Sequence, residues 1–286
     1  MIIIGEKINA SIPAVKTIIQ KQDDKTLIEL AQKQAAVGST YIDVNVGTGE
    51  GSRDDEILAM QWAIQIIQNK IDTPLCIDSA DPILLEAALE GRNGRTSLIN
   101  STKAEDDNLK KIIPLAVRHN AFLIALAMDD QGIPKTVQDR LTACEKIAEA
   151  CHRFGLFLDK VFFDPLVLPV STDISQGRVT LDTLTAIKEK FPEAQTVMGL
   201  SNISYGLPNR VGLNSAFLHM AVSAGLDAAI MDPLDQQMMA AVRTAEVLVG
   251  KDRHCRRYTR AFRKKEKRGK IEPYLKRSIF KKLNAY

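Results

Sequence analysis

The sequence predicts an α/β protein built as a single (β/α)8 barrel of the TIM type, and three observations lead to that fold class. Short apolar runs alternate with amphipathic stretches over most of the chain. The runs are almost continuously apolar, which is typical of parallel strands covered on both faces. They recur at spacings of roughly 30 to 40 residues, and eight such units in about 250 residues are what a barrel of this type requires.

The expected strands are residues 2–8, 41–47, 75–79, 97–101, 121–128, 161–165, 196–202 and 228–233. A doubly wound open sheet would also alternate strands and helices, but it usually has fewer strands and a glycine-rich first turn. The first turn here, "GEKINAS", lacks the GxGxxG pattern of such sheets. The barrel is therefore the favoured fold.

Amphipathic helices are expected between the strands. In the first of them, Leu27 and Ala31 lie on one apolar stripe at helical spacing. Thr26 and Glu29 have the spacing of a capping box at its start, and Gly38 is placed to end it.

The composition excludes several classes of protein. A hydrophobic fraction of 45% and a charged fraction of 26% over 286 residues are ordinary for a globular protein. No apolar run approaches the roughly 20 residues of a membrane span, and the start "MIIIGEKINAS" lacks the basic region of a signal peptide. Four cysteines without a CxxC pair indicate a reduced, cytoplasmic setting, and four histidines without clustered spacing argue against a metal site.

Charge is distributed unevenly along the chain. From Lys251 onward there are 15 basic and 3 acidic residues, whereas the preceding residues carry 23 basic and 32 acidic ones. We therefore expect a barrel over residues 1–250 and a basic C-terminal extension over residues 251–286. A solvated extension is expected, since the segment has no zinc-finger spacing and little aromatic interleaving, and nucleic-acid binding is unlikely by those features.

Polar side chains follow the apolar runs where the expected strands end. In a barrel of this type, catalytic groups come from the C-terminal ends of several strands. Asp129 and Asp232 are best explained as turn or helix-cap residues, because each lies in a turn-like sequence. The remaining polar residues at these ends are Asp43, Asn45, Asp78, Asn100, Asp164, Ser201 and Asn202.

These residue types indicate the chemistry of a ligand. Few cationic residues accompany them and there is no Walker loop, so a phosphate-rich substrate fits poorly. A carboxylate can accept two parallel hydrogen bonds from an amino group and an adjacent ring N–H, and a carboxamide can both donate and accept. Pterins and guanine-like rings present such an edge.

The motifs "GEKIN", "YIDVNVG", "CIDSAD", "LINST", "FFDPLVLPV" and "MGLSNISYGLPNR" follow one another in this order. With them the chain resembles the pterin-binding barrels, and specifically the methyltetrahydrofolate:corrinoid protein methyltransferases, over nearly its whole length to about residue 250. The resemblance implies that Asp78, Asn100 and Asp164 hydrogen-bond the pterin. It also implies that Asn202 approaches N5, the nitrogen that carries the methyl group. Asp43, Asn45 and Ser201 are expected in the same pocket.

The resemblance implies an enzyme that moves a methyl group between N5 of tetrahydrofolate and the cobalt of a corrinoid, in either direction. The Asp-x-His-x-x-Gly motif of cobalamin-binding modules does not occur, so the corrinoid is expected from outside, as free cobalamin or on a corrinoid protein. A homodimer is expected because the resembled family forms one.

Two alternatives remain open at this point. Dihydropteroate synthases share the barrel and the pterin carboxylates, but "NVGTGEGS" and "GLSNIS" stand where those enzymes have a Gly-Gly-Glu-Ser-Thr loop and a Ser-Arg-Lys motif. The second alternative is a non-enzymatic barrel whose basic extension binds nucleic acid.

Overall fold

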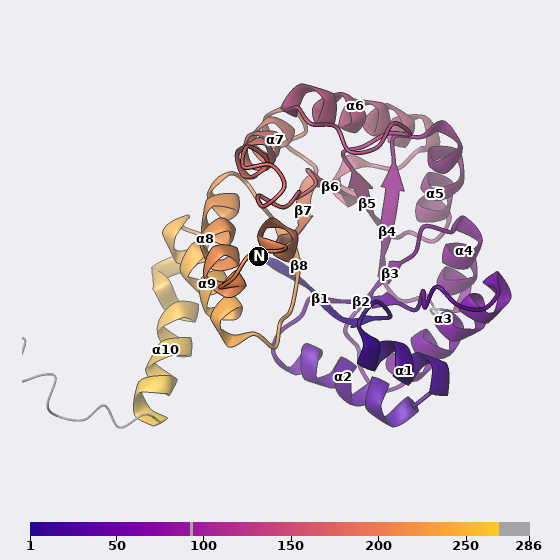
Figure 1. The fold of residues 1–286 in the computed structure, drawn as a ribbon, viewed down its shortest axis with the longest axis horizontal. Helices are drawn as coiled ribbons and strands as arrows, with labels where there is room; N and C mark the ends of the chain where they lie inside the picture. The colour runs from indigo at the N-terminus through magenta and orange to yellow at the C-terminus, as the bar shows by residue number, and fades with distance from the viewer. Residues whose placement is uncertain (92–93, 269–286) are drawn as a thin grey trace, which may run out of the picture. The chain divides into compact units, whose positions relative to one another are not determined.

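The structure, a computed structural model, describes residues 1–91 and 94–268. Within them, eight parallel strands pair in chain order, and the last pairs with the first to close a barrel. Figure 1 shows the strands in the middle, with helices α2 to α8 around them. The predicted fold class is confirmed. The strands are β1 (Ile2–Asn9), β2 (Tyr41–Asn45), β3 (Leu75–Asp78), β4 (Ser97–Lys103), β5 (Phe122–Leu126), β6 (Val161–Asp164), β7 (Gln195–Gly199) and β8 (Ala228–Met231).

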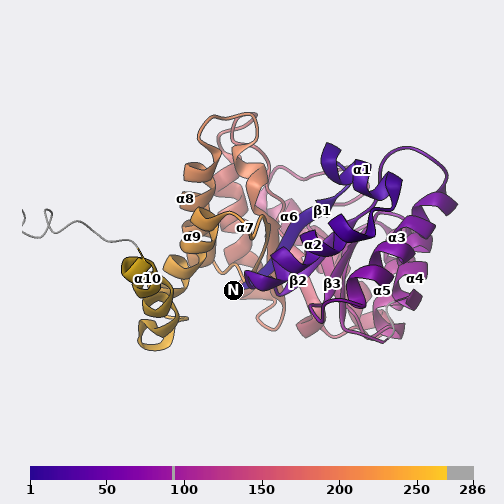
Figure 2. The ribbon, with the colours of Figure 1, turned by 90° about the horizontal axis from the view of Figure 1, so that it is seen from below.

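Helices follow each strand, with one addition to the predicted pattern. The first connection carries two helices, and Figure 2 shows the first of them, α1, at the end of the barrel where β1 ends. The helices are α1 (Pro13–Lys21), α2 (Asp24–Ala36), α3 (Arg53–Gln68), α4 (Pro82–Gly91), α5 (Asp106–Arg118), α6 (Val137–Phe154), α7 (Gln176–Lys190), α8 (Arg210–Ser223), α9 (Gln236–Leu248) and α10 (Arg256–Arg268).

The start of α2 differs from the prediction. Asp23, and not Thr26, is the residue that caps the helix: its Oδ1 accepts from the Thr26 backbone N–H at 3.1 Å, and its Oδ2 accepts from the Thr26 hydroxyl at 2.7 Å. The capping box predicted for Thr26 and Glu29 is wrong, because Thr26 already lies inside the first turn. Gly38 follows the end of the helix with a φ of 102°, a left-handed conformation that favours glycine, as predicted.

Apolar side chains fill the interior of the barrel. One inward-facing residue from each strand contributes to a buried cluster, which is formed by Ile4, Tyr41, Cys76, Leu98, Ile124, Phe162, Val197 and Ala228. Alternate residues of a strand point to the same face, so the residue two positions further on also faces inward, one layer nearer the C-terminal end. On four strands that next residue is a predicted site residue: Asp43, Asp78, Asn100 and Asp164.

The chain divides into two compact units, Met1–Val242 and Arg243–Tyr286. In the second unit, the Asp252 carboxylate accepts the backbone N–H groups of Arg257 at 3.1 Å and Tyr258 at 2.9 Å, and so caps the start of α10. Part of the predicted basic extension is therefore helical, and residues 269–286 lie outside the described residues. The predicted boundary after residue 250 stays a prediction.

None of the described helices is both long enough and apolar enough to cross a bilayer.

Candidate functional site

Four of the predicted site residues meet at the C-terminal ends of β2, β3 and β4. The Asn45 amide donates to Asp78 Oδ2 at 3.0 Å, and the Asn100 amide approaches Asp43 Oδ1 at 3.4 Å. Asn45 is itself held by the backbone N–H of Gly47, which donates to its Oδ1 at 3.0 Å. Each carboxyl group is thus in contact with a carboxamide from another strand: Asn45 of β2 contacts Asp78 of the adjacent β3, and Asn100 of β4 reaches across to Asp43 of β2.

The two carboxyl groups of this cluster interact, and Asp43 is buried while Asp78 is half-buried. Asp43 is only 2% exposed, and its pKa is raised, first by burial and then by the negative charge of Asp78. The pKa of Asp78 is also raised by burial, against the opposing effect of the Asn45 hydrogen bond. Beneath them, the Cys76 thiol is hydrogen-bonded to Asp43, and burial raises its pKa so that it stays neutral. Because two adjacent carboxyls resist double ionisation, the charge on one opposes the ionisation of the other.

Asp164 lies at the end of β6 and has separate partners. Its side chain is 7% exposed, and its Oδ1 accepts the backbone N–H of Leu166 at 2.8 Å. Burial raises the pKa of Asp164 to about 7, although the Leu166 hydrogen bond and the positive charge of Arg140 act in the opposite direction. The carboxyl therefore changes charge in the neutral range.

Ser201 and Asn202 occupy a short 3₁₀ helix, Leu200–Ser204, directly after β7. The Arg210 guanidinium fixes this segment by donating to the Ser201 carbonyl at 2.8 Å and to the Ser204 hydroxyl at 3.0 Å. The Asn202 side chain is exposed and, within the described part of the chain, makes no hydrogen bond. It is therefore free to meet a ligand. The structure connects neither residue by a hydrogen bond to the β2–β4 group.

Sequence reasoning missed a polar group on β1 and β8. Glu6 stands two residues after the inward-facing Ile4, and its pKa is raised by burial first and by Asp232 second. Lys7 forms an ion pair with Asp232 at 3.1 Å, while the other oxygen of Asp232 accepts the backbone N–H of Leu234 at 2.9 Å. Asp232 thus has the predicted turn contact together with an ion pair at the barrel mouth. The alternation along the first strand could have identified Glu6.

Asp129, the other residue predicted to form a turn, does so. Its Oδ1 accepts the backbone N–H of Gln131 at 2.9 Å, and it forms an isolated bridge with Gly132.

The carboxyl groups at the barrel mouth offer hydrogen-bond acceptors to a ligand and are not paired with cationic side chains. Within the described residues, no lysine or arginine lies within ion-pair distance of Asp43, Asp78 or Asp164. In that same part of the chain, no group of three histidine, cysteine or acidic side chains is placed to hold a metal ion. Buried carboxylates without cations are stabilised by N–H donors, so the arrangement suits a neutral heterocycle with several such donors on one edge.

Comparison with known proteins identifies the family. The family model described as "Pterin binding enzyme" matches residues 6–232. The chain belongs to this family. It is 36% identical over 275 residues to a methylcorrinoid:tetrahydrofolate methyltransferase from Eubacterium limosum, covering 96% of this chain and 98% of the relative. It is 30% identical over 246 residues to the methionine synthase of Mycobacterium tuberculosis, covering 81% of this chain and 20% of that protein.

Solved structures agree on the fold of this pterin-binding enzyme. Dihydropteroate synthase from Vibrio fischeri ES114 superimposes with a TM-score of 0.62 at 21% identity, covering 78% of this chain and 86% of that one. The Yersinia pestis enzyme gives a TM-score of 0.66 at 14% identity, covering 87% and 93%. At these identities the likeness concerns the barrel alone. The predicted membership of the pterin-binding barrels, of the methyltransferase type, is confirmed, whereas the roles of the individual site residues stay predictions.

Proposed function

We propose that this pterin-binding enzyme moves a methyl group between N5 of tetrahydrofolate and the cobalt of a corrinoid. The observation that carries the proposal is the set of buried or half-buried carboxyls at the barrel mouth, Asp43, Asp78 and Asp164, with no cation at ion-pair distance in the described residues. A dihydropteroate synthase must hold a pyrophosphate leaving group, which this acceptor-rich site does not favour. The 36% identity to a methylcorrinoid:tetrahydrofolate methyltransferase supports the same choice.

The pterin ring is held by Asp78, Asn100 and Asp164. The carboxylates accept hydrogen bonds from the amino group and ring N–H groups, and the carboxamide serves both a donor and an acceptor position. Asn45 acts through Asp78, and Asp43 acts through Asn100, because these are hydrogen-bond partners in the protein. Ser201 contributes through the segment that carries Asn202.

Asn202 acts on N5. A tertiary amine leaves poorly unless its developing electron pair is stabilised or protonated, so transfer from N5 needs a donor at that atom. In the reverse direction, N5 attacks the methyl carbon as its bond to cobalt breaks. The Asn202 amide hydrogen-bonds N5 more strongly in the state with more charge, which favours the transition state over the bound substrate. An amide supplies no net proton, so its contribution is to orient N5 and to stabilise its charge.

The corrinoid enters as the second substrate, either free or on a partner protein, and meets the pterin at the open barrel mouth. The name of the Eubacterium limosum relative places the methyl group on the corrinoid before transfer, so we propose transfer toward tetrahydrofolate as the physiological direction. We place the enzyme in the cytoplasm, which is supported by four unpaired cysteines, of which Cys76, Cys144 and Cys151 are buried.

We also propose that the protein is a homodimer. An apolar groove of about 310 Å³ runs between α7 and α8, and Met220 on its border is 53% exposed. Covering such a surface with a second copy would remove apolar area from water. A mass near that of the 31.6 kDa monomer in light scattering would contradict the proposal.

The test of the activity is the absorbance of cobalamin under anaerobic conditions. Methylcobalamin mixed with tetrahydrofolate should lose its absorbance and give cob(I)alamin, and 5-methyltetrahydrofolate should reverse the change. The two initial rates report the activity and its preferred direction together. Release of pyrophosphate from dihydropterin pyrophosphate and p-aminobenzoate, without any cobalamin change, would instead identify a synthase.

A further inference from the structure

Arg140 on α6 is the largest completely buried side chain of the described residues, with 0% exposure. Its guanidinium donates to five acceptors: Nε to the Pro134 carbonyl at 2.9 Å, Nη1 to the carbonyls of Pro165 and Leu166 at 2.9 Å each and to the Thr180 hydroxyl at 3.5 Å, and Nη2 to Gln176 Oε1 at 2.8 Å. These contacts join the loop after β5, the turn after β6 and the start of α7. Arg140 therefore holds together the segments around Asp164.

None of these partners is a carboxylate. Burial lowers the pKa of Arg140, and the charge of Asp164 acts in the opposite direction. Even so, an arginine stays protonated in a protein, so a full positive charge is enclosed here among neutral groups. An apolar side chain of similar volume usually stabilises a protein at least as well as a buried charge does. A role in stability alone therefore explains the position poorly.

The Leu166 peptide connects this guanidinium to the candidate pterin carboxylate. The Leu166 N–H donates to Asp164 Oδ1 at 2.8 Å, and its carbonyl accepts from Arg140 and from the Thr180 hydroxyl, the latter at 3.0 Å. Leu166 has a φ of 66°, a left-handed conformation that a side chain other than glycine rarely adopts. The turn is thus kept in an unfavourable conformation that directs its N–H at Asp164.

We infer that Arg140 is a positioning residue for Asp164, which fixes the turn after β6 and supplies the positive charge that favours the carboxylate form of Asp164. The inference rests on the proposed function, because Asp164 needs to be ionised only if it accepts hydrogen bonds from a ligand such as the pterin. Sequence analysis pointed to Asp164 itself, whereas Arg140 lies 24 positions earlier in the chain, on a different element.

The charge balance around Asp164 supports this role. Burial raises the pKa of Asp164 to about 7, and within the described residues the influences that oppose it are the Leu166 N–H and Arg140. The other titratable group facing Asp164 in the described residues is the Cys144 thiol on α6, which is neutral because burial raises its pKa. From α7, Gln176 and Thr180 face Arg140 and do not titrate. Removing the guanidinium charge should therefore leave Asp164 protonated at neutral pH.

The experiment compares Arg140→Met with Thr180→Val. Both variants remove a donor to the Leu166 carbonyl, but only the first removes a charge. The readouts are the pKa of Asp164, from a ¹³C carboxyl NMR titration assigned with Asp164→Asn, and the affinity for 5-methyltetrahydrofolate from pH 6 to 9. In Arg140→Met the pKa of Asp164 should rise by roughly one to three units. The affinity for 5-methyltetrahydrofolate at pH 7 should fall about tenfold for each unit by which the pKa of Asp164 rises, and it should recover as the pH is raised. Thr180→Val should leave the titration midpoint unchanged.

An unmoved midpoint in Arg140→Met, or an equal shift in Thr180→Val, would overturn the inference in favour of simple packing. If Arg140→Met does not fold, Gln176→Glu replaces it: this nearly isosteric change sets a carboxylate against Nη2, and the same upward shift is expected. The Asp164→Asn protein distinguishes a failure of the proposed function from a failure of the role of Arg140. Wild-type folate affinity in that protein would remove Asp164 from the site, whereas weakened binding there with an unmoved midpoint in Arg140→Met would contradict only the role of Arg140.

Discussion

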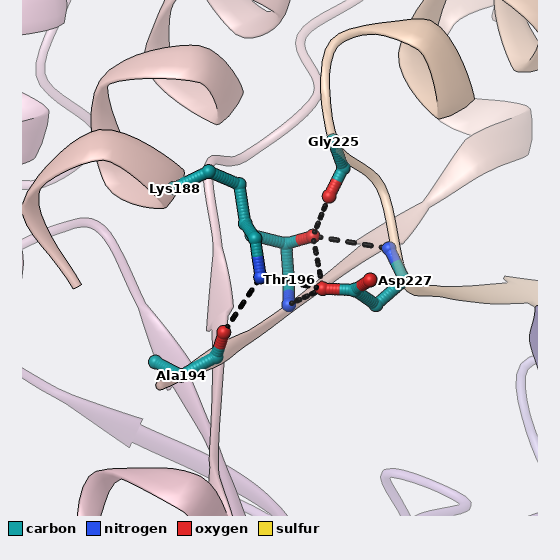
Figure 3. Close-up of polar contacts among 5 residues, drawn as sticks. All are labelled: Lys188, Ala194, Thr196, Gly225 and Asp227. Carbon is teal, nitrogen blue, oxygen red and sulfur yellow. Dashed lines mark hydrogen bonds and ion pairs between the residues drawn. The ribbon is translucent and has the colours of Figure 1, made fainter. Parts of the chain in front are cut away.

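Carboxyl groups at the two ends of the barrel have different partners. At the C-terminal end, Asp43, Asp78 and Asp164 have pKa values raised chiefly by burial, and none of the three has a cation at ion-pair distance in the described residues. At the N-terminal end, the Asp227 carboxylate before β8 receives the Lys188 ammonium of α7 at 3.1 Å and the Thr196 backbone N–H of β7 at 3.2 Å. Figure 3 shows how these groups converge.

Donors and acceptors at the N-terminal end satisfy one another. The Thr196 hydroxyl donates to the Gly225 carbonyl at 2.8 Å and accepts the Asp227 N–H at 3.1 Å, and Lys188 also donates to the Ala194 carbonyl at 2.9 Å. Gly225 leaves room for this arrangement, since a Cβ there would come within 2.7 Å of Lys188 Cγ. The result is a network that joins β7, β8 and α7 without a ligand.

Polar groups therefore have different roles at the two ends of this barrel. Paired groups at the N-terminal end connect neighbouring strands and stabilise the fold. Carboxyl groups without a cation at ion-pair distance at the C-terminal end are available to a ligand, and keeping them there lowers stability. Substitutions at the two ends should therefore separate activity from stability.

Asn202→Ala should have the largest effect, and it should fall on chemistry. We expect the methyl-transfer step to slow by roughly tenfold to a thousandfold, because one hydrogen bond to the transition state is lost. The melting temperature should hardly change, since the exposed Asn202 side chain makes no hydrogen bond in the described part of the chain. Single-turnover cobalamin absorbance at saturating folate measures the step. A wild-type rate with a lowered melting temperature would make Asn202 a residue of the turn.

Asp164→Asn should weaken folate binding by about 1.5 to 3 kcal/mol, or roughly tenfold to a hundredfold, because a donor replaces an acceptor facing the pterin N–H groups. Calorimetry with 5-methyltetrahydrofolate at pH 8 measures it. Unchanged affinity would place Asp164 outside the pocket.

The same Asp164→Asn variant should be more stable than the wild type at high pH. The native pKa of about 7 lies above the ordinary value of 3.8, so between these values the native state binds the extra proton and stability falls as the pH rises. The variant escapes this loss. Its advantage should be absent near pH 4 and reach on the order of 1 to 3 kcal/mol at pH 8. Urea unfolding at both pH values tests the sign, and equal stability at pH 8 would contradict it.

Asp227→Ala, at the N-terminal end of the barrel, should lower stability and leave folate binding intact. Removing the acceptor of the Thr196 N–H and the ion-pair partner of Lys188, which keeps only the Ala194 carbonyl, should lower the free energy of unfolding by about 1 to 3 kcal/mol, with folate affinity unchanged. Asp182→Ala is the matched control on α7, because it removes only an exposed ion pair with Arg178 and should cost a few tenths of a kcal/mol. A loss of folate binding in Asp227→Ala would break the division between the two ends.

Truncation after Gly250 should have the smallest effect. The candidate site residues all precede that point, so the fold and the reaction with free cobalamin should be retained. If the basic extension contributes, it should speed the encounter with an acidic corrinoid protein, and added salt should abolish that difference. Insoluble protein after truncation would show that the segment belongs to the folded core.

The sequence by itself determined the barrel and most of the candidate site. Continuous apolar runs specify buried parallel strands, and the period of two along each strand places Asp43, Asp78 and Asp164 on the inner face once Tyr41 and Phe162 fill the interior. These are local patterns, so they can be recognised without knowing which strands are neighbours.

Only the tertiary structure decided which polar groups are partners. The Asn45–Asp78 contact spans 33 residues of sequence, Lys188 and Asp227 are 39 apart, and Arg140 reaches Gln176 across 36. Such pairs are selected by barrel closure and by how each helix packs on its strands, which no local pattern encodes. The fold also decides the partners of identical residue types: Asp227 receives the Lys188 ammonium and the Thr196 N–H, whereas the side chain of Asp164 receives the Leu166 N–H and has no cation at ion-pair distance in the described residues.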